Sequence, residues 1–173
     1  MKSSEIVQQI DSADISERLV GITPVYLNNF LQRHLFGLTA SVQEGKLRKK
    51  HRLFSREDVF GIALVWLLFE SGLRTNPTIR VLKEIVGSDK ANAKANRAAE
   101  KLLESKADYL VISRQPRTPT KTPLDKPGQT VRVARASEIA EMLSQHPAAE
   151  LLLVPIGHKF EDVRKRLEML FGG

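Results

Sequence analysis

The apolar positions in the first third of the chain repeat at helical spacing. Residues 24–35 are predicted to form a helix with one apolar side, made of Val25, Leu27, Phe30, Leu31 and Leu35. Before it, Gly21 suits a turn, Thr23 an N-cap and Pro24 the first helical position. Shorter apolar patterns predict helices over residues 3–10 and 15–20. The pattern therefore indicates that a turn joins the short helix over residues 15–20 to the helix over residues 24–35.

The longest apolar run, residues 59–69, follows a clear signal for the start of a helix. Ser55 and Asp58 have the spacing of a capping box, and Gly72 is positioned to end the helix. The run is apolar nearly all round, so the helix must be covered on more than one side. We expect it to be the central core helix, and its apolar surface leaves open a contact with a second protein.

Between the helix over residues 24–35 and the core helix the helical pattern stops, and residues 37–54 are predicted to form a short hairpin or loop. Two further helices are predicted after the core helix. Asn76-Pro77 repeats the cap-then-proline signal before a helix that ends near Val86, and an Ala-rich helix spans about 89–104.

The second half of the chain has a different character. Strands are predicted over residues 109–112, 131–134 and 151–156, with helices over 137–146 and 160–171. The segment 114–129 contains four prolines and is expected to be an extended, flexible loop. The order β-loop-β-α-β-α predicts a small α/β module.

These elements predict an α+β protein with a mainly helical N-terminal part and a small C-terminal α/β module. The expected boundaries are a domain over residues 1–87, a connecting or dimerisation helix over 88–105, and the module over 106–173.

Charge changes this picture, because it is concentrated in two places. The chain has a formal net charge of +7, yet residues 33–56 carry a net +6 and residues 114–135 a net +5. A basic balance favours anionic partners such as nucleic acid. The absence of cysteine excludes disulfides and thiolate metal sites. With no signal-peptide pattern at the start and no apolar run long enough for a bilayer, we expect a cytoplasmic protein without membrane contact.

Two groups of residues are candidates for nucleic-acid contact. In a helix-turn-helix the second helix enters the major groove, and here its polar side would hold Asn28, Asn29, Gln32 and Arg33, with Tyr26 near a phosphate. A solvated helix face has the same composition, so that alternative stays open. The stronger signal is the basic segment, residues 46–52, which is expected to contact the phosphate backbone of an adjacent groove. Six of its seven side chains are basic: Lys46, Arg48, Lys49, Lys50, His51 and Arg52.

These motifs resemble the MerR-type winged helix-turn-helix domain. The resemblance rests on Gly21-Ile22-Thr23-Pro24, on Arg52-Leu53-Phe54-Ser55-Arg56-Glu57-Asp58 and on Gly72-Leu73, and it covers about residues 15–86. It implies a homodimeric transcription regulator that binds double-stranded DNA, with Asn28, Asn29 and the wing residues Lys50 and Arg52 near the DNA. The C-terminal half does not resemble the family's long dimerisation helix. Its module is expected to serve dimerisation or the sensing of a small-molecule or protein effector.

Catalytic, metal-binding and cofactor-binding patterns are absent from the sequence. The four histidines stand alone, and no Gly-rich phosphate loop is present. We therefore expect no enzyme, no metal and no cofactor. Three alternatives stay open: a protein–protein interaction module, an RNA-binding protein, and an enzyme that binds a phosphorylated substrate through His158, Lys159 and Arg132.

Overall fold

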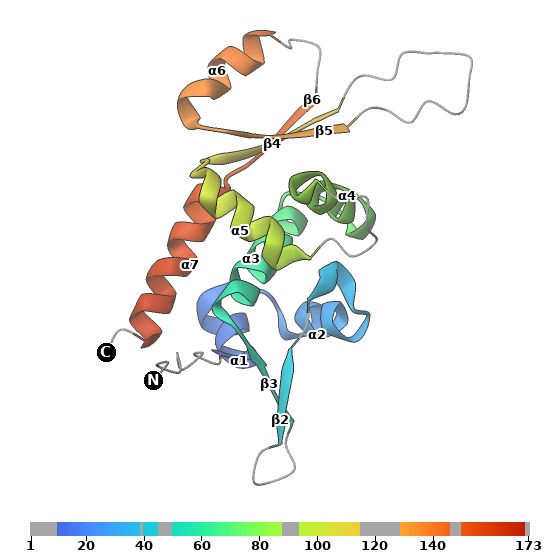
Figure 1. Cartoon of the computed structure of the whole chain (residues 1–173), viewed down its shortest axis with the longest axis vertical. Coiled ribbons are helices and arrows are strands. Elements are labelled where there is room, and N and C mark those ends of the chain that lie inside the picture. Colours follow the sequence, from blue (N-terminus) through green and yellow to red (C-terminus); the bar gives the residue numbers. More distant parts are fainter. Residues whose placement is uncertain are drawn as a thin grey trace, which may run out of the picture.

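The computed structural model describes residues 10–38, 40–44, 50–87, 94–114, 129–145 and 150–171. It is a mixed α+β structure, mostly helical, with two small antiparallel sheets (Figure 1). The helices are α1 (Ser12–Asp14), the π-helical turn η1 (Ile15–Leu19), α2 (Pro24–Gln32), the 3₁₀ turn η2 (Leu35–Gly37), α3 (Arg56–Glu70), α4 (Thr75–Val86), α5 (Ala95–Ser105), α6 (Ala136–Gln145) and α7 (Ile156–Phe171). The strands are β1 (Ile10–Asp11), β2 (Ser41–Glu44), β3 (Lys50–Phe54), β4 (Tyr109–Arg114), β5 (Gln129–Ala134) and β6 (Glu150–Val154).

The first sheet confirms the predicted hairpin. Strands β2 and β3 pair antiparallel with Val42 opposite Arg52, and β1 pairs with the other edge of β3 through Ile10 and Phe54. The strand order is therefore β1-β3-β2. The helix predicted over residues 3–10 lies outside the described residues except for Ile10, which belongs to a strand.

The two short helices are present, but their bounds differ from the prediction. The first begins as α1, which runs directly into η1, and Asp11 caps α1 by accepting a hydrogen bond from the backbone N–H of Ala13 at 2.8 Å. The second, α2, ends at Gln32 and not at Leu35, because His34 adopts a left-handed backbone conformation with φ of 48°. A left-handed residue cannot continue an α-helix.

The prediction of a central core helix is confirmed in α3. The hydroxyl of Ser55 accepts a hydrogen bond from the backbone N–H of Asp58 at 3.2 Å, and the Asp58 carboxylate accepts one from the Ser55 N–H at 3.1 Å. This capping box starts the helix directly after β3. The nine buried residues of α3 are Val59, Phe60, Gly61, Ile62, Ala63, Leu64, Val65, Leu67 and Leu68. Contacts within the chain thus bury most of the apolar run, and Trp66 and Phe69 are half-buried.

Small residues let α5 pack closely against α3. Ala95, Ala98 and Ala99 of α5 have no exposed surface. Gly61 of α3 lies so near that an added Cβ would stand 2.7 Å from the backbone nitrogen of Asn96. The neighbouring helix α4 begins at Thr75, so Asn76 and Pro77 occupy its first turn and are not the cap predicted from the sequence. The helix ends after Val86, as predicted, and Gly87 adopts a left-handed conformation there.

The predicted order of the C-terminal elements is confirmed. Strand β4 lies between β5 and β6 in an antiparallel sheet, with Leu110 opposite both Val133 and Val154. Helix α6 lies over one side of this sheet, and α4 and α5 lie on the other (Figure 1). Strand β6 ends at Val154, and α7 begins at Ile156, earlier than predicted. Residues 115–128 of the predicted loop lie outside the described residues.

One hydrophobic core runs through both halves of the chain. It includes residues of η1 and α3 together with residues of β4, β6 and α7. The rings of Phe60 in α3 and Phe160 in α7 meet edge to face, with centroids 5.6 Å apart. The core is therefore continuous across the boundaries predicted near residues 87 and 105.

Candidate nucleic-acid interface

The polar side of α2 is free of the core. Leu27, Phe30 and Leu31 anchor the helix, with at most 8% of each side chain exposed. The predicted contact residues lie on the outside of the helix, and all are exposed: Tyr26, Asn28, Asn29, Gln32 and Arg33. Asn28, Asn29, Gln32 and Arg33 are exposed on one side, as predicted, because the three buried residues fix the rotation of the helix.

One residue of α2 was assigned to the wrong side. Val25 was expected to belong to the apolar face, but it is 69% exposed. The reason is helical spacing: Val25 lies three and four positions before Asn28 and Asn29, so it shares the exposed side of α2 with them. Val25 therefore adds an apolar side chain to the exposed surface at the start of α2.

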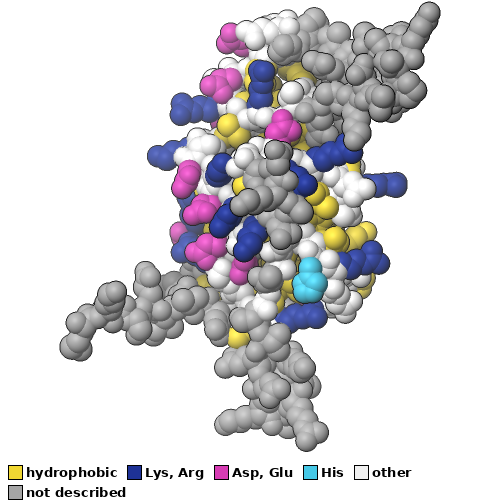
Figure 2. Space-filling view, turned by 45° about the vertical axis from the view of Figure 1, so that its right-hand side comes forward, with side chains coloured by type: hydrophobic (Ala, Val, Ile, Leu, Met, Phe, Trp, Pro, Cys, Tyr) yellow, Lys and Arg dark blue, Asp and Glu magenta, His cyan; other side chains and the backbone are white. Residues whose placement is uncertain are grey.

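Aromatic packing determines where Tyr26 lies. Its ring centroid is 5.3 Å from that of Trp66 in α3 and 6.2 Å from that of Phe30. The side chain is still 46% exposed. The ring thus braces the first turn of α2 against α3 while part of its surface faces outward. Figure 2 shows Lys, Arg and hydrophobic side chains together at the lower right of one face of the molecule.

The hairpin of β2 and β3 contacts α2 through a hydrogen bond between side chains. The guanidinium of Arg52 in β3 donates from Nη1 to Oδ1 of Asn28 in α2. Arg52 is half-buried, and its strand position is opposite Val42. Both the hairpin and α2 lie at the same end of the molecule (Figure 1). The structure thus brings together one residue from each of the two groups predicted from the sequence.

The rest of the basic segment is only partly described. Lys46, Arg48 and Lys49 fall in residues 45–49, which lie outside the described residues. The backbone of Lys50 belongs to β3 and is paired with Glu44. Five residues therefore separate the two paired strands, and three of the five are basic.

The C-terminal helix contacts the helix that precedes α2. The ammonium of Lys159 in α7 donates to the backbone carbonyl of Val20 at 2.9 Å, and Arg166 donates to the carbonyl of Arg18 at 3.1 Å. The last carbonyls of a helix have no partner within it, and cations are favourable at that end. Helix α7 thus stabilises the end of η1. No local sequence signal predicts this contact, because the two partners are 139 positions apart in one bond and 148 in the other.

This use of Lys159 bears on the alternative of a phosphorylated substrate. That alternative requires Lys159, His158 and Arg132 to converge on one site. The Lys159 ammonium is instead bonded to the backbone of Val20. Arg132 lies in β5, exposed and opposite Val111. The geometry of Lys159 does not favour the phosphate site.

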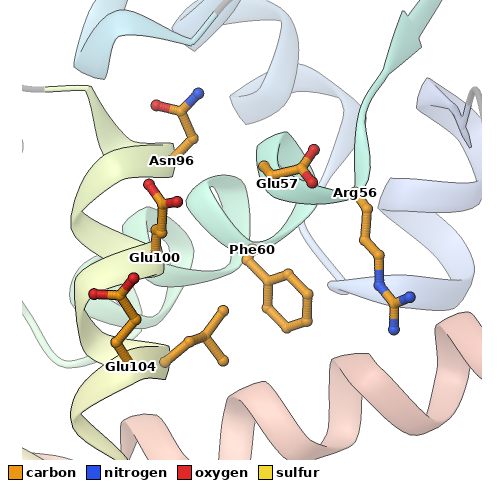
Figure 3. A pocket seen from close by; sticks show the side chains of 7 residues that line it. Arg56, Glu57, Phe60, Asn96, Glu100 and Glu104 are labelled. Atoms are coloured by element: carbon orange, nitrogen blue, oxygen red, sulfur yellow. The ribbon is translucent and has the colours of Figure 1, made fainter. Parts of the chain in front are cut away.

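A cavity of about 260 Å³ lies between α3 and α5, near α7 (Figure 3). Phe60 projects into it, and acidic side chains stand around it. Its lining residues are Arg56, Glu57, Phe60, Asn96, Glu100, Leu103 and Glu104. Three carboxylates against one guanidinium repel a phosphate backbone. The cavity is therefore a poor surface for nucleic acid, in contrast to α2 and the hairpin.

No protein-family model matches the chain, and no curated protein matches it either. Within the described part of the chain, none of the helices combines the length and the apolar character needed to cross a bilayer.

Proposed function

We propose that this protein is a transcription regulator that binds double-stranded DNA through a MerR-like winged helix-turn-helix. In this proposal η1 and α2 are the helix-turn-helix, and the hairpin of β2 and β3 is the wing. The observation that carries the proposal is the hydrogen bond between Arg52 and Asn28. It joins a basic hairpin to the exposed polar side of a short helix, so that both can contact one duplex.

The dimensions and the charge of this surface suit DNA. An α-helix fits into the major groove, and the nine residues of α2 span about 13 Å. Asn28, Asn29, Gln32 and Arg33 carry the donors and acceptors that read base edges. The basic segment supplies cations for phosphates, including Lys46, Arg48, Lys49 and Lys50. Phosphate contacts give affinity and register, whereas base contacts give specificity.

The remaining elements have proposed roles that follow from their positions. We propose a homodimer, since a two-fold regulator reads two half-sites. The C-terminal module would respond to an effector, and α7 would connect it to the DNA-binding part. The contacts from Lys159 and Arg166 to the end of η1 support that connection.

A salt titration of binding tests the proposal. Binding of the whole chain to duplex DNA, single-stranded DNA and structured RNA is measured over a range of salt concentrations. We expect the duplex to bind best, with an affinity that falls steeply as salt rises. The variant Lys49→Ala/Lys50→Ala should weaken binding to every duplex. It should also reduce the slope of log K against log salt by about 0.9 for each phosphate that the variant no longer neutralises.

A matched control separates the hairpin from overall charge. The variant Arg132→Ala/Arg135→Ala removes the same two charges from exposed positions in and beside β5, at the opposite end of the molecule (Figure 1). It should leave the salt slope unchanged. If the two variants lose affinity equally, the hairpin has no special role. Preferential binding to structured RNA would favour the RNA-binding alternative, and no binding to any nucleic acid would favour a protein–protein module.

A further inference from the structure

The hydrogen bond between the hairpin and α2 determines which atoms of Asn28 face outward. Arg52 donates to the side-chain oxygen of Asn28. A guanidinium has five donors and no acceptor, so the part of the amide that faces it must be the oxygen and not the nitrogen. The amide NH₂ is then directed away from Arg52. The chemistry of the pair thus fixes an orientation that an isolated asparagine side chain would leave open.

A fixed orientation matters for base recognition. A free asparagine pairs with adenine by accepting from N6–H and donating to N7. In this protein Arg52 occupies one of the two lone pairs of the Asn28 oxygen and fixes its direction, while both N–H donors of the amide stay available. Guanine presents two neighbouring acceptors in the major groove, N7 and O6, and adenine presents an acceptor beside a donor. The Asn28 amide, with its N–H donors directed away from Arg52, is therefore complementary to the acceptors N7 and O6 of guanine.

We propose that Arg52 is a positioning residue for base recognition, which holds the Asn28 amide so that it donates to guanine in the major groove. The inference rests on the proposed DNA-binding function and changes the role of one residue within it. From the sequence, Arg52 was expected to act as part of a wing that contacts phosphates. Its half-buried strand position and its bond to Asn28 place it between the hairpin and the helix instead.

Selection from a random duplex library tests this role. The full-length chain and the variants Asn28→Ala, Arg52→Gln and Arg52→Lys are each used to select DNA, and melting temperatures confirm that all four are folded. The wild type should prefer guanine at one position by roughly 5-fold, the lower end of the range for base contacts, because the amide nitrogen is a single donor group. Asn28→Ala should lose this preference. Arg52→Gln should also lose it, because glutamine can accept as well as donate and no longer fixes the amide.

Arg52→Lys is the rescue control. Lysine has donors only, so it still requires the Asn28 oxygen and should retain the preference for guanine. The inference is overturned if Arg52→Gln keeps the wild-type preference and only reduces the salt slope, because Arg52 is then a phosphate contact. It is also overturned if the wild type prefers adenine at the position that Asn28 governs. Failure of the wild type to bind any duplex is a separate result, and it refutes the proposed function itself.

Discussion

Replacement of Gly61 by alanine is a direct test of how α3 and α5 pack. The added Cβ would lie 2.7 Å from the nitrogen of Asn96 and 3.0 Å from the carbonyl carbon of Ala95. Both are backbone atoms, so no side chain can rotate away to make room. Ordinary contacts begin at 3.4 Å, and the two helices would have to separate by roughly 0.7 Å.

Two opposing effects decide the outcome. Alanine in place of glycine inside a helix normally stabilises it by about 0.5–1 kcal/mol. Overpacking a tight interface costs about 1–3 kcal/mol, and the upper part of that range applies where the backbone itself must shift. We therefore expect Gly61→Ala to lower the free energy of unfolding by roughly 1–2 kcal/mol. For a chain of this length the melting temperature should fall by roughly 2–8 °C.

Calorimetry and urea unfolding of the full-length chain measure this change. Glu70→Ala, an exposed substitution in the same helix, is the control and should stay within about 0.5 kcal/mol of the wild type. The sign of the result is decisive. If Gly61→Ala melts at or above the wild-type temperature, helix propensity has prevailed and α5 does not approach α3 this closely.

Two further predictions concern α7. Phe160→Ala should destabilise the protein by about 3–5 kcal/mol, because it removes a buried ring that packs on Phe60. The control Met169→Ala, at a position 79% exposed in the same helix, should change stability by less than about 0.5 kcal/mol. Equal effects of the two variants in urea unfolding would contradict the packing of α7 on α3. Lys159→Ala/Arg166→Ala should speed hydrogen exchange of the amides in residues 15–20 several-fold, since the end of η1 loses two charged donors. Lys165→Ala, which leaves both bonds in place, is the control, and unchanged exchange in the double variant would show that α7 does not support η1.

Local signals in the sequence determined much of the fold. Ser55 and Asp58 interact across three positions, so the start of α3 can be recognised without any distant contact. The order of strands and helices in the C-terminal part follows in the same way from periods of two and about 3.6 residues. The basic segment and the polar side of α2 were also visible, because composition and helical spacing are properties of the chain itself.

Local signals failed where a longer-range interaction competed with them. The apolar pattern extended α2 to Leu35, but Phe36 is buried with its ring 5.1 Å from Phe30 and 5.9 Å from Phe69. Phe36 has a φ of 59° and His34 a φ of 48°, so the chain turns at this point and the helix ends early. Burial of Phe36 between two aromatic rings offsets the cost of the left-handed backbone, about 1–3 kcal/mol for each such residue.

Only the tertiary structure decided which of these elements meet. The sequence predicted Asn28 and Arg52 as separate candidates, and nothing within either segment indicates that one side chain bonds to the other. The close approach at Gly61 and the contact of α7 with η1 are equally invisible in sequence. Such contacts depend on the relative placement of elements that are far apart along the chain, and that placement is set by how all the buried faces fit together. The sequence by itself thus determined the elements and the charge they carry, and the packing of the shared core determined the surface on which Asn28 and Arg52 meet.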